Sequence, residues 1–283
     1  MPVKVITDST ADLPPALAEE LDITIIPLNV HFGTDGYKDG VDILPEEFYR
    51  RLVSSTKLPT TSQPSVGDFL GLYNDLAKTT NQIVSVHISA KLSGTMNSAT
   101  QAREEYQGDC RIEIVDSRQG SMGLGMVAIA AARTAISGAN IEKVVEEALL
   151  AVPRVKFFGM LDTLEYLEKG GRIGKAQAFV GSLLRIKPLL TARDGEIHPL
   201  ERARTRGKGI DRLYELAREH MPLVDLGVVY TTMPEDALDL ARRLAPLLPN
   251  GEVSVSQIGP VVGTHTGPGV LGIALRAEGL GQY

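Results

Sequence analysis

The sequence of 283 residues contains a single cysteine, Cys110. One thiol cannot form an intrachain disulfide and cannot supply a cysteine-based metal site, so both are excluded. Cysteine usage of this kind suits a reducing compartment, and we therefore expect a cytoplasmic protein.

Positive charge is also in short supply. The chain has 29 basic residues against 35 acidic ones, which gives a formal net charge of −6. Proteins that bind nucleic acid through a broad surface carry an excess of basic residues on it, so nucleic acid is not an expected partner.

Long apolar runs are missing as well. The longest spans residues 122–136, includes Arg133 and many small side chains, and is shorter than the roughly 20 residues that a membrane-spanning helix needs. We expect it to be a buried helix and expect at most transient membrane contact. The start of the chain lacks the basic and apolar segments of a secretion signal, so export is not expected.

Several catalytic motifs are not found. The sequence contains no Gly-x-Ser-x-Gly elbow, no Walker loop and no His-Glu-x-x-His motif. Residues 123–128, GLGMVA, formally match a dinucleotide fingerprint. However, they do not directly follow a strand, and no strand ending in an acid comes after them, so we reject that match. No cofactor, metal site or catalytic residue is therefore predicted.

The composition, with 43% hydrophobic and 23% charged residues, is that of a folded globular protein long enough for two α/β domains. In the first half, strands alternate with helices, which predicts a parallel, doubly wound sheet covered by helices on both faces. The expected strands are residues 3–7, 23–30, 82–89 and 111–117, and residues 32–41 and 57–65 are expected loops. Asp12 is expected to cap a helix that runs to Leu21, and further helices are expected over 46–55, 66–78, 94–106, 120–137 and 141–151.

The second half predicts a smaller α/β domain with a mixed or antiparallel sheet. An Asp-Gly pair at 194–195 separates two extended runs, 187–192 and 196–202, which is a strong hairpin signal. Strand 156–161 ends the first half and leads into a glycine-broken helical region, 163–184. The other expected elements of the second half are strands 226–232 and 252–258 and helices 206–220 and 234–248. We place the domain boundary near residue 160, giving domains 1–160 and 161–283.

Three polar segments are candidates for holding an anionic headgroup. The first, residues 88–95, joins a strand to a helix, where free N–H groups favour an anion. There Ser93 adds a hydroxyl group, unless it only caps the helix. The second, residues 59–65, is rich in hydroxyl groups, unless it is only a loop with Ser65 as the cap. The third, residues 263–269, is a glycine-rich turn in which His265 can donate to a carboxylate.

Basic residues gather in two places. Residues 169–175 place cations on a glycine turn, and Arg202, Arg204, Arg206 and Lys208 follow further along the chain. Either group could face a phosphate or an acidic partner, or be an ordinary solvated face.

With these residues in view, the chain resembles the DegV family of bacterial fatty-acid-binding proteins along nearly its whole length. Single stretches are weakly specific, but several in the same order are hard to obtain by chance. The matching stretches are VITDSTADL at 5–13, TSQPS at 61–65, LSGT at 92–95, LEYL at 164–167 with KGGRI at 169–173, IKP at 186–188, and GTHTGPG at 263–269.

The resemblance implies a carrier rather than an enzyme. It implies a tunnel in the N-terminal domain for the acyl chain of one long-chain fatty acid, with the carboxylate near the interdomain cleft, closed by the C-terminal domain. It also implies a separate fatty acid kinase that phosphorylates the bound carboxylate for phospholipid metabolism. The positions that match the carboxylate site are Thr61, Ser62, Ser93, Gly94, Thr264 and His265, and the candidates for contact with the kinase are Arg172 and Arg202.

Two enzymatic alternatives remain open from the sequence alone. One is a small-molecule phosphotransferase that uses the basic turns. The other is a hydrolase that uses Ser93 with His265. A third possibility is a regulatory partner protein that uses the lipid as a signal.

Overall fold

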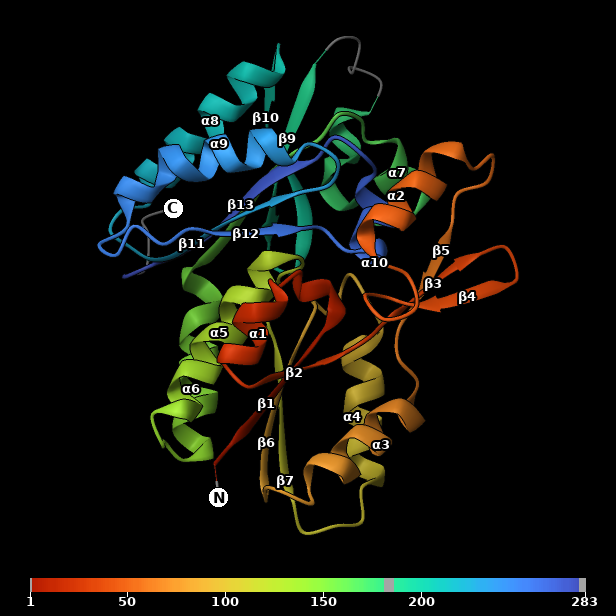
Figure 1. Cartoon of the computed structure of the whole chain (residues 1–283), viewed down its shortest axis with the longest axis vertical. Helices are drawn as coiled ribbons and strands as arrows, with labels where there is room; N and C mark the ends of the chain where they lie inside the picture. Colours follow the sequence, from red (N-terminus) through yellow and green to blue (C-terminus); the bar gives the residue numbers. More distant parts are fainter. Residues whose placement is uncertain (1, 181–185, 280–283) are drawn as a thin grey trace.

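The first sheet is the parallel sheet that the N-terminal half of the sequence predicts (Figure 1). The computed structural model describes residues 2–180 and 186–279. In this sheet the strands lie in the order β2-β1-β6-β7 and all pairs are parallel. The strands are β1 (Lys4–Asp8), β2 (Ile23–Ile26), β6 (Gln82–His87) and β7 (Arg111–Asp116).

Helices cover both faces of this sheet because successive strand residues point to opposite sides. Ile6 of β1 packs with Phe69 and Tyr73 of α3, whereas its neighbour Val5 belongs to the core that includes α5. The helices of the first face are α3 (Val66–Leu76) and α4 (Thr95–Glu105), and those of the second are α1 (Pro15–Glu20), α5 (Met122–Ile136) and α6 (Ile141–Arg154). The doubly wound arrangement is confirmed.

The second sheet is mixed, as expected, and has six strands in the order β10-β9-β8-β13-β11-β12. Only the β11-β12 pair is parallel. Its strands are β8 (Val155–Met160), β9 (Lys187–Arg193), β10 (Glu196–Ala203), β11 (Leu223–Tyr230), β12 (Ser254–Gln257) and β13 (Leu271–Ala277). Two helices cover its outer face, α8 (Arg206–Glu219) and α9 (Pro234–Leu244), and the 3-10 turn η3 (Ala245–Leu247) follows α9. Strand β13 was not expected, although it pairs with both β8 and β11. The division into domains 1–160 and 161–283 stays a prediction, and β8 lies in the second sheet.

Helix α5 lies between the two sheets (Figure 1). Nearly all of its residues are buried, which confirms the expectation for this apolar run. The helix packs closely on both sides. A Cβ atom at Gly125 would stand 2.9 Å from the carbonyl oxygen of Ala11, and a Cβ atom at Gly227 of β11 would stand 3.1 Å from both Met122 and Met126. No helix in the described part of the chain is long and apolar enough to cross a membrane.

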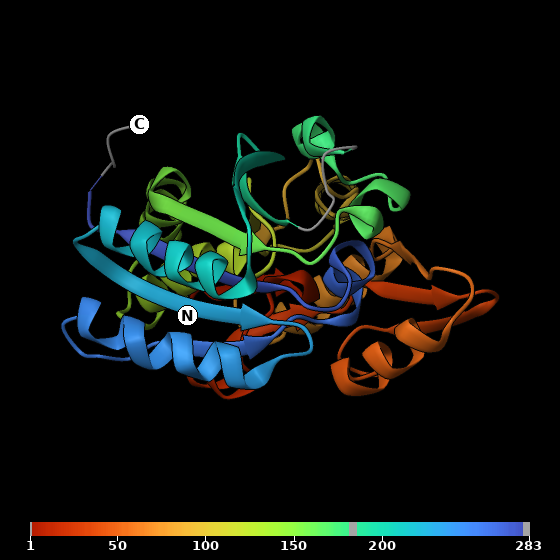
Figure 2. The same ribbon diagram turned by 90° about the horizontal axis from the view of Figure 1, so that it is seen from above.

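A third, small sheet projects to one side of the molecule together with α2 (Pro45–Ser54) (Figure 2). It contains β3 (Asn29–Phe32), β4 (Asp35–Lys38) and β5 (Thr60–Ser62). The expectation of one strand over 23–30 was wrong, because Pro27 has no N–H to donate and the chain leaves the first sheet there. The expected loops 32–41 and 57–65 likewise contain β4 and β5.

The predicted hairpin at Asp194 and Gly195 is confirmed, and both residues have positive φ, 51° and 80°. The helical region expected over 163–184 is broken into α7 (Glu165–Lys169) and a 3-10 turn, η2 (Gly174–Phe179), with Gly171 at φ 70° between them. Residues 181–184 of that region lie outside the described residues. The expected turn at 263–269 is mostly helix, because α10 (Pro260–Thr266) occupies its first part.

Candidate functional site

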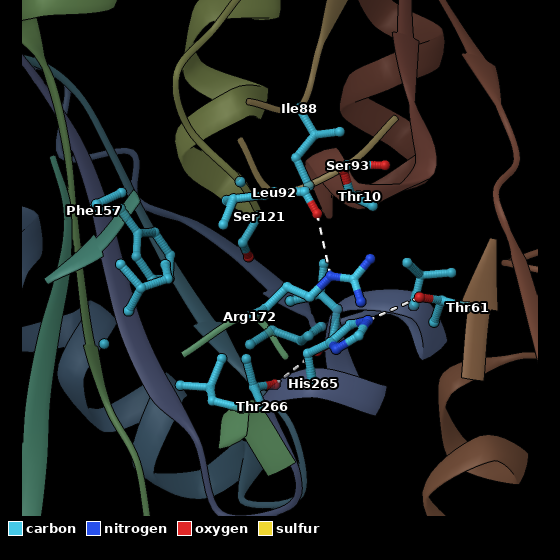
Figure 3. Close-up of a pocket in the computed structure, with 18 of the residues that line it drawn as sticks. Thr10, Thr61, Ile88, Leu92, Ser93, Ser121, Phe157, Arg172, His265 and Thr266 are labelled. Carbon is cyan, nitrogen blue, oxygen red and sulfur yellow. Dashed lines mark hydrogen bonds between the residues drawn. The ribbon is translucent and has the colours of Figure 1, made fainter. Parts of the chain in front are cut away.

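A pocket opens where the two large sheets, the third sheet and α10 meet (Figure 3). The space that it encloses, together with the open space at its mouth, is about 1040 Å³. Its lining comes from distant parts of the chain and has one apolar region and one polar end.

The apolar region is built mainly by the second sheet. Phe157 and Gly159 of β8, Leu190 of β9 and Ile197 of β10 form one wall. Facing residues come from the loop after β6, from the segment before α5 and from α7 and α10; they include Ile88, Leu92, Leu167, Val261 and Val262. The resemblance implies a tunnel inside the N-terminal domain, whereas this wall draws on both halves of the chain.

The polar end joins β5 to α10. Thr61 of β5 and His265 of α10 are hydrogen-bonded, with 2.8 Å between Thr61 Oγ1 and His265 Nε2. The next residue, Ser62, has its Oγ 3.0 Å from Nε2 of His31 on the neighbouring strand β3. Thr61, Ser62 and His265 all line the pocket, so the structure brings these three predicted residues together.

His265 is neutral at physiological pH. Burial, and secondly the positive charge of Arg172, lower the pKa of its imidazole to about 4. Its second ring nitrogen, Nδ1, is buried and has no hydrogen-bond partner among the described residues. Gly170 lies against that nitrogen, since a Cβ atom there would stand 2.3 Å from it. The ring therefore offers hydrogen bonding without a full charge.

Ser93 also lines the pocket, at the start of α4. It is not the cap of this helix, because the N-cap residue is Gly94. Instead, Ser93 Oγ lies 2.9 Å from Thr95 Oγ1 and accepts a hydrogen bond from the Thr95 N–H at 3.3 Å. In the second segment Ser65 caps α3, as the alternative interpretation expected, whereas Thr61 and Ser62 belong to strand β5 and line the pocket.

Gly94 and Thr264 take part less directly. Gly94 is packed against the side chain of Gln63, and a Cβ atom there would stand 2.8 Å from Gln63 Nε2. Thr264 is buried and donates its hydroxyl hydrogen to the carbonyl of Pro260, one helical turn earlier, at 2.9 Å. Neither residue is part of the pocket lining, although their neighbours Gln63 and His265 are.

The two predicted arginines occupy different places. Arg172 lines the pocket, donates through Nη1 to the carbonyl of Gly170 at 2.9 Å and reaches the carbonyl of Leu92 at 3.4 Å (Figure 3). The guanidinium of Arg202, on β10, lies 4.3 Å from the ring centroid of Phe179. Arg202 does not line the pocket.

The hydrolase interpretation required Ser93 and His265 to form a pair. In the described residues Ser93 bonds to Thr95 and His265 bonds to Thr61, so the expected nucleophile and base are engaged elsewhere. The basic turns of the phosphotransferase alternative are partly neutralised, since Arg206 pairs with Asp236 and Asp162.

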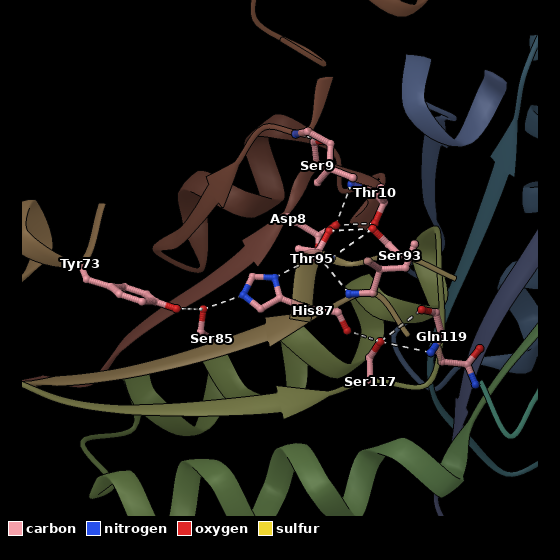
Figure 4. Close-up of polar contacts among 12 residues, drawn as sticks. Asp8, Ser9, Thr10, Tyr73, Ser85, His87, Ser93, Thr95, Ser117 and Gln119 are labelled. Atoms are coloured by element: carbon pink, nitrogen blue, oxygen red, sulfur yellow. Dashed lines mark hydrogen bonds and ion pairs between the residues drawn. The ribbon is translucent and has the colours of Figure 1, made fainter. Parts of the chain in front are cut away.

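A buried carboxylate that the sequence reasoning missed organises the loops beside the pocket (Figure 4). Asp8, at the end of β1, accepts hydrogen bonds from the N–H groups of Thr10 and Ile88 at 3.1 and 3.0 Å and from the hydroxyl group of Thr10. His87 Nδ1 lies 3.0 Å from the same carboxylate. Because Thr10 and Ile88 line the pocket, Asp8 fixes two of its walls.

The network continues away from the pocket. Ser85 Oγ lies 2.7 Å from His87 Nε2, and Tyr73 donates to Ser85 at 3.4 Å (Figure 4). Ser85, His87 and Asp8 thus follow the order of a catalytic triad. All three are completely buried, so no substrate reaches the serine and the arrangement is structural.

Two further carboxylates that the sequence reasoning missed, Asp12 and Asp39, lie at the beginning of α10. Asp12 accepts from the Gly259 N–H at 2.8 Å and from Ser121, which lines the pocket. Asp39 accepts from Ser9 at 2.9 Å. The expectation that Asp12 caps the first helix was wrong, because its buried side chain reaches across to the second half of the chain instead.

Burial raises the pKa of both carboxyl groups, to about 8 for Asp12 and to about 7 for Asp39. Their mutual repulsion adds to the rise of the Asp12 pKa. Both carboxyl groups are therefore partly protonated near neutral pH. Among the described residues, no group of three or more His, Cys, Asp or Glu side chains could hold a metal ion.

Known proteins share this architecture. The family model described as the DegV family of uncharacterised proteins matches residues 2–278. A DegV domain-containing protein of Streptomyces coelicolor is 39% identical over 280 residues, covering 98% of this chain and 99% of the relative.

Two solved structures are similar over almost the full length. A structure described as the fatty acid binding of a DegV family protein from Thermus thermophilus has a TM-score of 0.90 and 34% identity, covering 98% of this chain and 100% of the other. A stearic acid-binding protein from Eubacterium ventriosum has a TM-score of 0.87 and 28% identity, covering 97% and 98%.

Proposed function

This chain belongs to the DegV family, and from that premise we propose that it binds one long-chain fatty acid and presents its carboxylate to a separate fatty acid kinase. The observation that carries the proposal is the pocket itself, in which a long apolar wall ends at a neutral pair of hydrogen-bonding groups, Thr61 and His265. The fatty acid binding described for the Thermus thermophilus and Eubacterium ventriosum proteins supports it.

Burial of the acyl chain supplies the affinity. About fourteen methylene groups at roughly 0.8 kcal/mol each give a gross gain on the order of 11 kcal/mol, before the cost of ordering the chain and the pocket. The wall formed by Phe157, Leu190 and Ile197 offers the apolar contacts for such a chain. We propose that the acyl chain lies along this wall between the two sheets.

The carboxylate would then lie at Thr61, Ser62, Ser93 and His265. A buried carboxylate is costly unless several hydrogen bonds satisfy it. With the Nε2–H tautomer, His265 donates to Thr61 Oγ1, and the hydroxyl hydrogen of Thr61 is free to donate to the ligand. Gly94 places the N-terminus of α4 nearby, and Thr264 bonds back to Pro260 within α10, the helix that carries His265.

We propose that the kinase transfers the γ-phosphoryl group of ATP to a carboxylate oxygen, giving an acyl phosphate and ADP. Metal and nucleotide would be positioned by that partner. Arg172, which is exposed at the pocket, and Arg202 are the proposed contacts with it. A cytoplasmic location fits this exchange.

Native mass spectrometry of the purified protein tests the binding step. The expected result is one long-chain fatty acid per chain, or uptake of one added fatty acid after delipidation. A protein that is empty and refuses added fatty acid would contradict the proposal. Acyl phosphate formation with a fatty acid kinase and ATP tests the second step, and Arg202→Ala should slow it without releasing the lipid.

A further inference from the structure

Alternate residues of β8 line the part of the pocket that lies across from Thr61 (Figure 3). Phe157 and Gly159 face the pocket, whereas Phe158 and Met160 point to the opposite side of the sheet and pack in the core under α8 and α9. Figure 3 shows Phe157 across the pocket from Thr61, with Arg172 between them. The aromatic ring thus lies far from the polar end.

The ring of Phe157 packs over two glycines, Gly159 and Gly272, which together form a glycine floor without side chains. Gly159 on β8 and Gly272 on β13 are direct cross-strand partners. A Cβ atom at Gly159 would stand 3.2 Å from Phe157 Cε1, and one at Gly272 would stand 3.1 Å from Phe157 Cζ. The ring therefore packs against both glycines through Cε1 and Cζ, in space that side chains would otherwise fill.

The other side of Phe157 faces α5. A Cβ atom at Gly123 would stand 3.4 Å from Phe157 Cβ, so the side chain fills the gap between the second sheet and this helix. The residue is nevertheless only partly buried, and it lines the pocket. Its position makes it the boundary between the pocket and the packed interior.

We propose that Phe157, held in place by the glycine floor, is the stop that sets the longest acyl chain accepted. The inference rests on the proposed function, since it concerns the same pocket. A hydrocarbon end that met the ring could advance only by displacing it into a close-packed interior, which is costly. Chain length is thereby limited by one side chain rather than by the length of the sheet.

Two substitutions should move the limit in opposite directions. Phe157→Ala removes the ring and leaves room above Gly159 and Gly272 for more of the chain. Each further methylene group that becomes buried is worth about fourfold in affinity. The ratio of bound octadecanoate to hexadecanoate, which differ by two methylene groups, should therefore rise roughly 15-fold. Gly159→Ala places a methyl group against the ring, pushes it toward the pocket and should lower this ratio.

The experiment is competition loading of the delipidated full chain with an equimolar mixture of saturated acids from dodecanoate to icosanoate, read by native mass spectrometry. Phe158→Leu is the matched control, because its side chain lies on the other face of the same strand and should leave the ratio unchanged. Phe157→Leu provides a milder variant, expected to shift the ratio in the same direction as Phe157→Ala, if that protein folds poorly.

The outcomes separate the two proposals. Uptake of fatty acid by the wild type with the same length distribution in both Phe157→Leu and Gly159→Ala would overturn the role of Phe157 while leaving the carrier function intact. A wild type that takes up no fatty acid would overturn the carrier function itself. Equal shifts in Phe157→Leu and Phe158→Leu would also count against the stop, because they would indicate a general loss of packing.

Discussion

Thr61 and His265 are 204 positions apart in the sequence, yet Thr61 Oγ1 and His265 Nε2 are 2.8 Å apart in the structure. One residue lies on an edge strand of the small third sheet and the other on a helix from the C-terminal half. This contact closes the polar end of the pocket, and its strength should be visible in ligand binding.

Thr61→Val keeps the shape and strand preference of the residue but removes its hydroxyl group. A hydrogen bond to a charged group contributes about 1.5–3 kcal/mol, so fatty acid affinity should fall roughly 10- to 100-fold. Titration calorimetry with a fatty acid and with the corresponding fatty alcohol measures the effect, and the alcohol should lose much less. Thr60→Val, at the exposed neighbouring position, is the matched control; an equal loss in both variants would remove Thr61 from the site.

Ser93→Ala should impair acyl phosphate formation more than chain binding, because the hydrophobic contacts of the acyl chain remain. The comparison is between fatty acid retained per protein and acyl phosphate formed per bound fatty acid in the presence of the kinase and ATP. Ser65→Ala, which removes a helix cap worth about 1 kcal/mol, controls for stability. A proportional loss of binding and phosphorylation in Ser93→Ala would contradict the assigned role.

The ring of His265 should stay neutral in the ligand-free protein down to about pH 5, because the pKa of its imidazole is lowered to about 4 by burial and by Arg172. Since the folded pKa lies below the unfolded value, the stability that this group contributes is complete above about pH 6.5 and declines as the pH falls through about 4. NMR titration of the ring, assigned with His265→Gln, measures it. A midpoint near 6.5 would show that the residue is not buried as described.

For Asp12 and Asp39 we expect the opposite dependence of stability on pH. Their folded pKa values, about 8 and about 7, lie above the unfolded value of 3.8. The folded state therefore holds protons that the unfolded state has lost, and these groups make the free energy of unfolding decrease as the pH rises from about 4 to about 8. The slope is at most about 1.4 kcal/mol per pH unit for each carboxyl group.

Asp12→Asn mimics the protonated state and should flatten that decrease in urea unfolding curves recorded across this pH range. Asp109→Asn, at an exposed position, is the control and should leave the slope as it is in the wild type. An unchanged slope in Asp12→Asn would mean that Asp12 does not take up a proton on folding.

Local sequence signals predicted the regular parts of the fold. The Asp194-Gly195 hairpin followed from turn chemistry, because both positions need positive φ. The errors arose where tertiary contacts decide the structure. Strand β13 was missed because the run 271–277 follows a glycine-rich segment that reads as loop, and Gly272 interrupts its apolar residues. Helix α10 forms where its first turn is held by Asp12, a contact 247 positions away in sequence.

The candidate site shows the same division. The segments that contain Thr61, Ser93 and His265 were singled out by their hydroxyl groups, glycines and helix start, and the family resemblance assigned these residues to one carboxylate site. Asp8 had a weak local signal as an acid at the end of a buried strand, but its partner Ile88 is 80 positions away. Partners at such distances are set by how strands are ordered in the sheet, which spacing along the chain does not reveal.

Helix α5 is buried along most of its length, since the first sheet packs against one face and the second sheet against the other; only its last turn, with Arg133 and Ile136, reaches solvent. A hinge motion between the two halves of the molecule would have to separate α5 from one of the two sheets and expose its apolar side chains to water. We therefore expect a fatty acid to enter and leave by local movement at the rim, where the projecting third sheet and α2 lie, while the two large sheets stay fixed as one frame. Exchange of the ligand would then depend on movement of these peripheral elements and not on a rearrangement of the two large sheets.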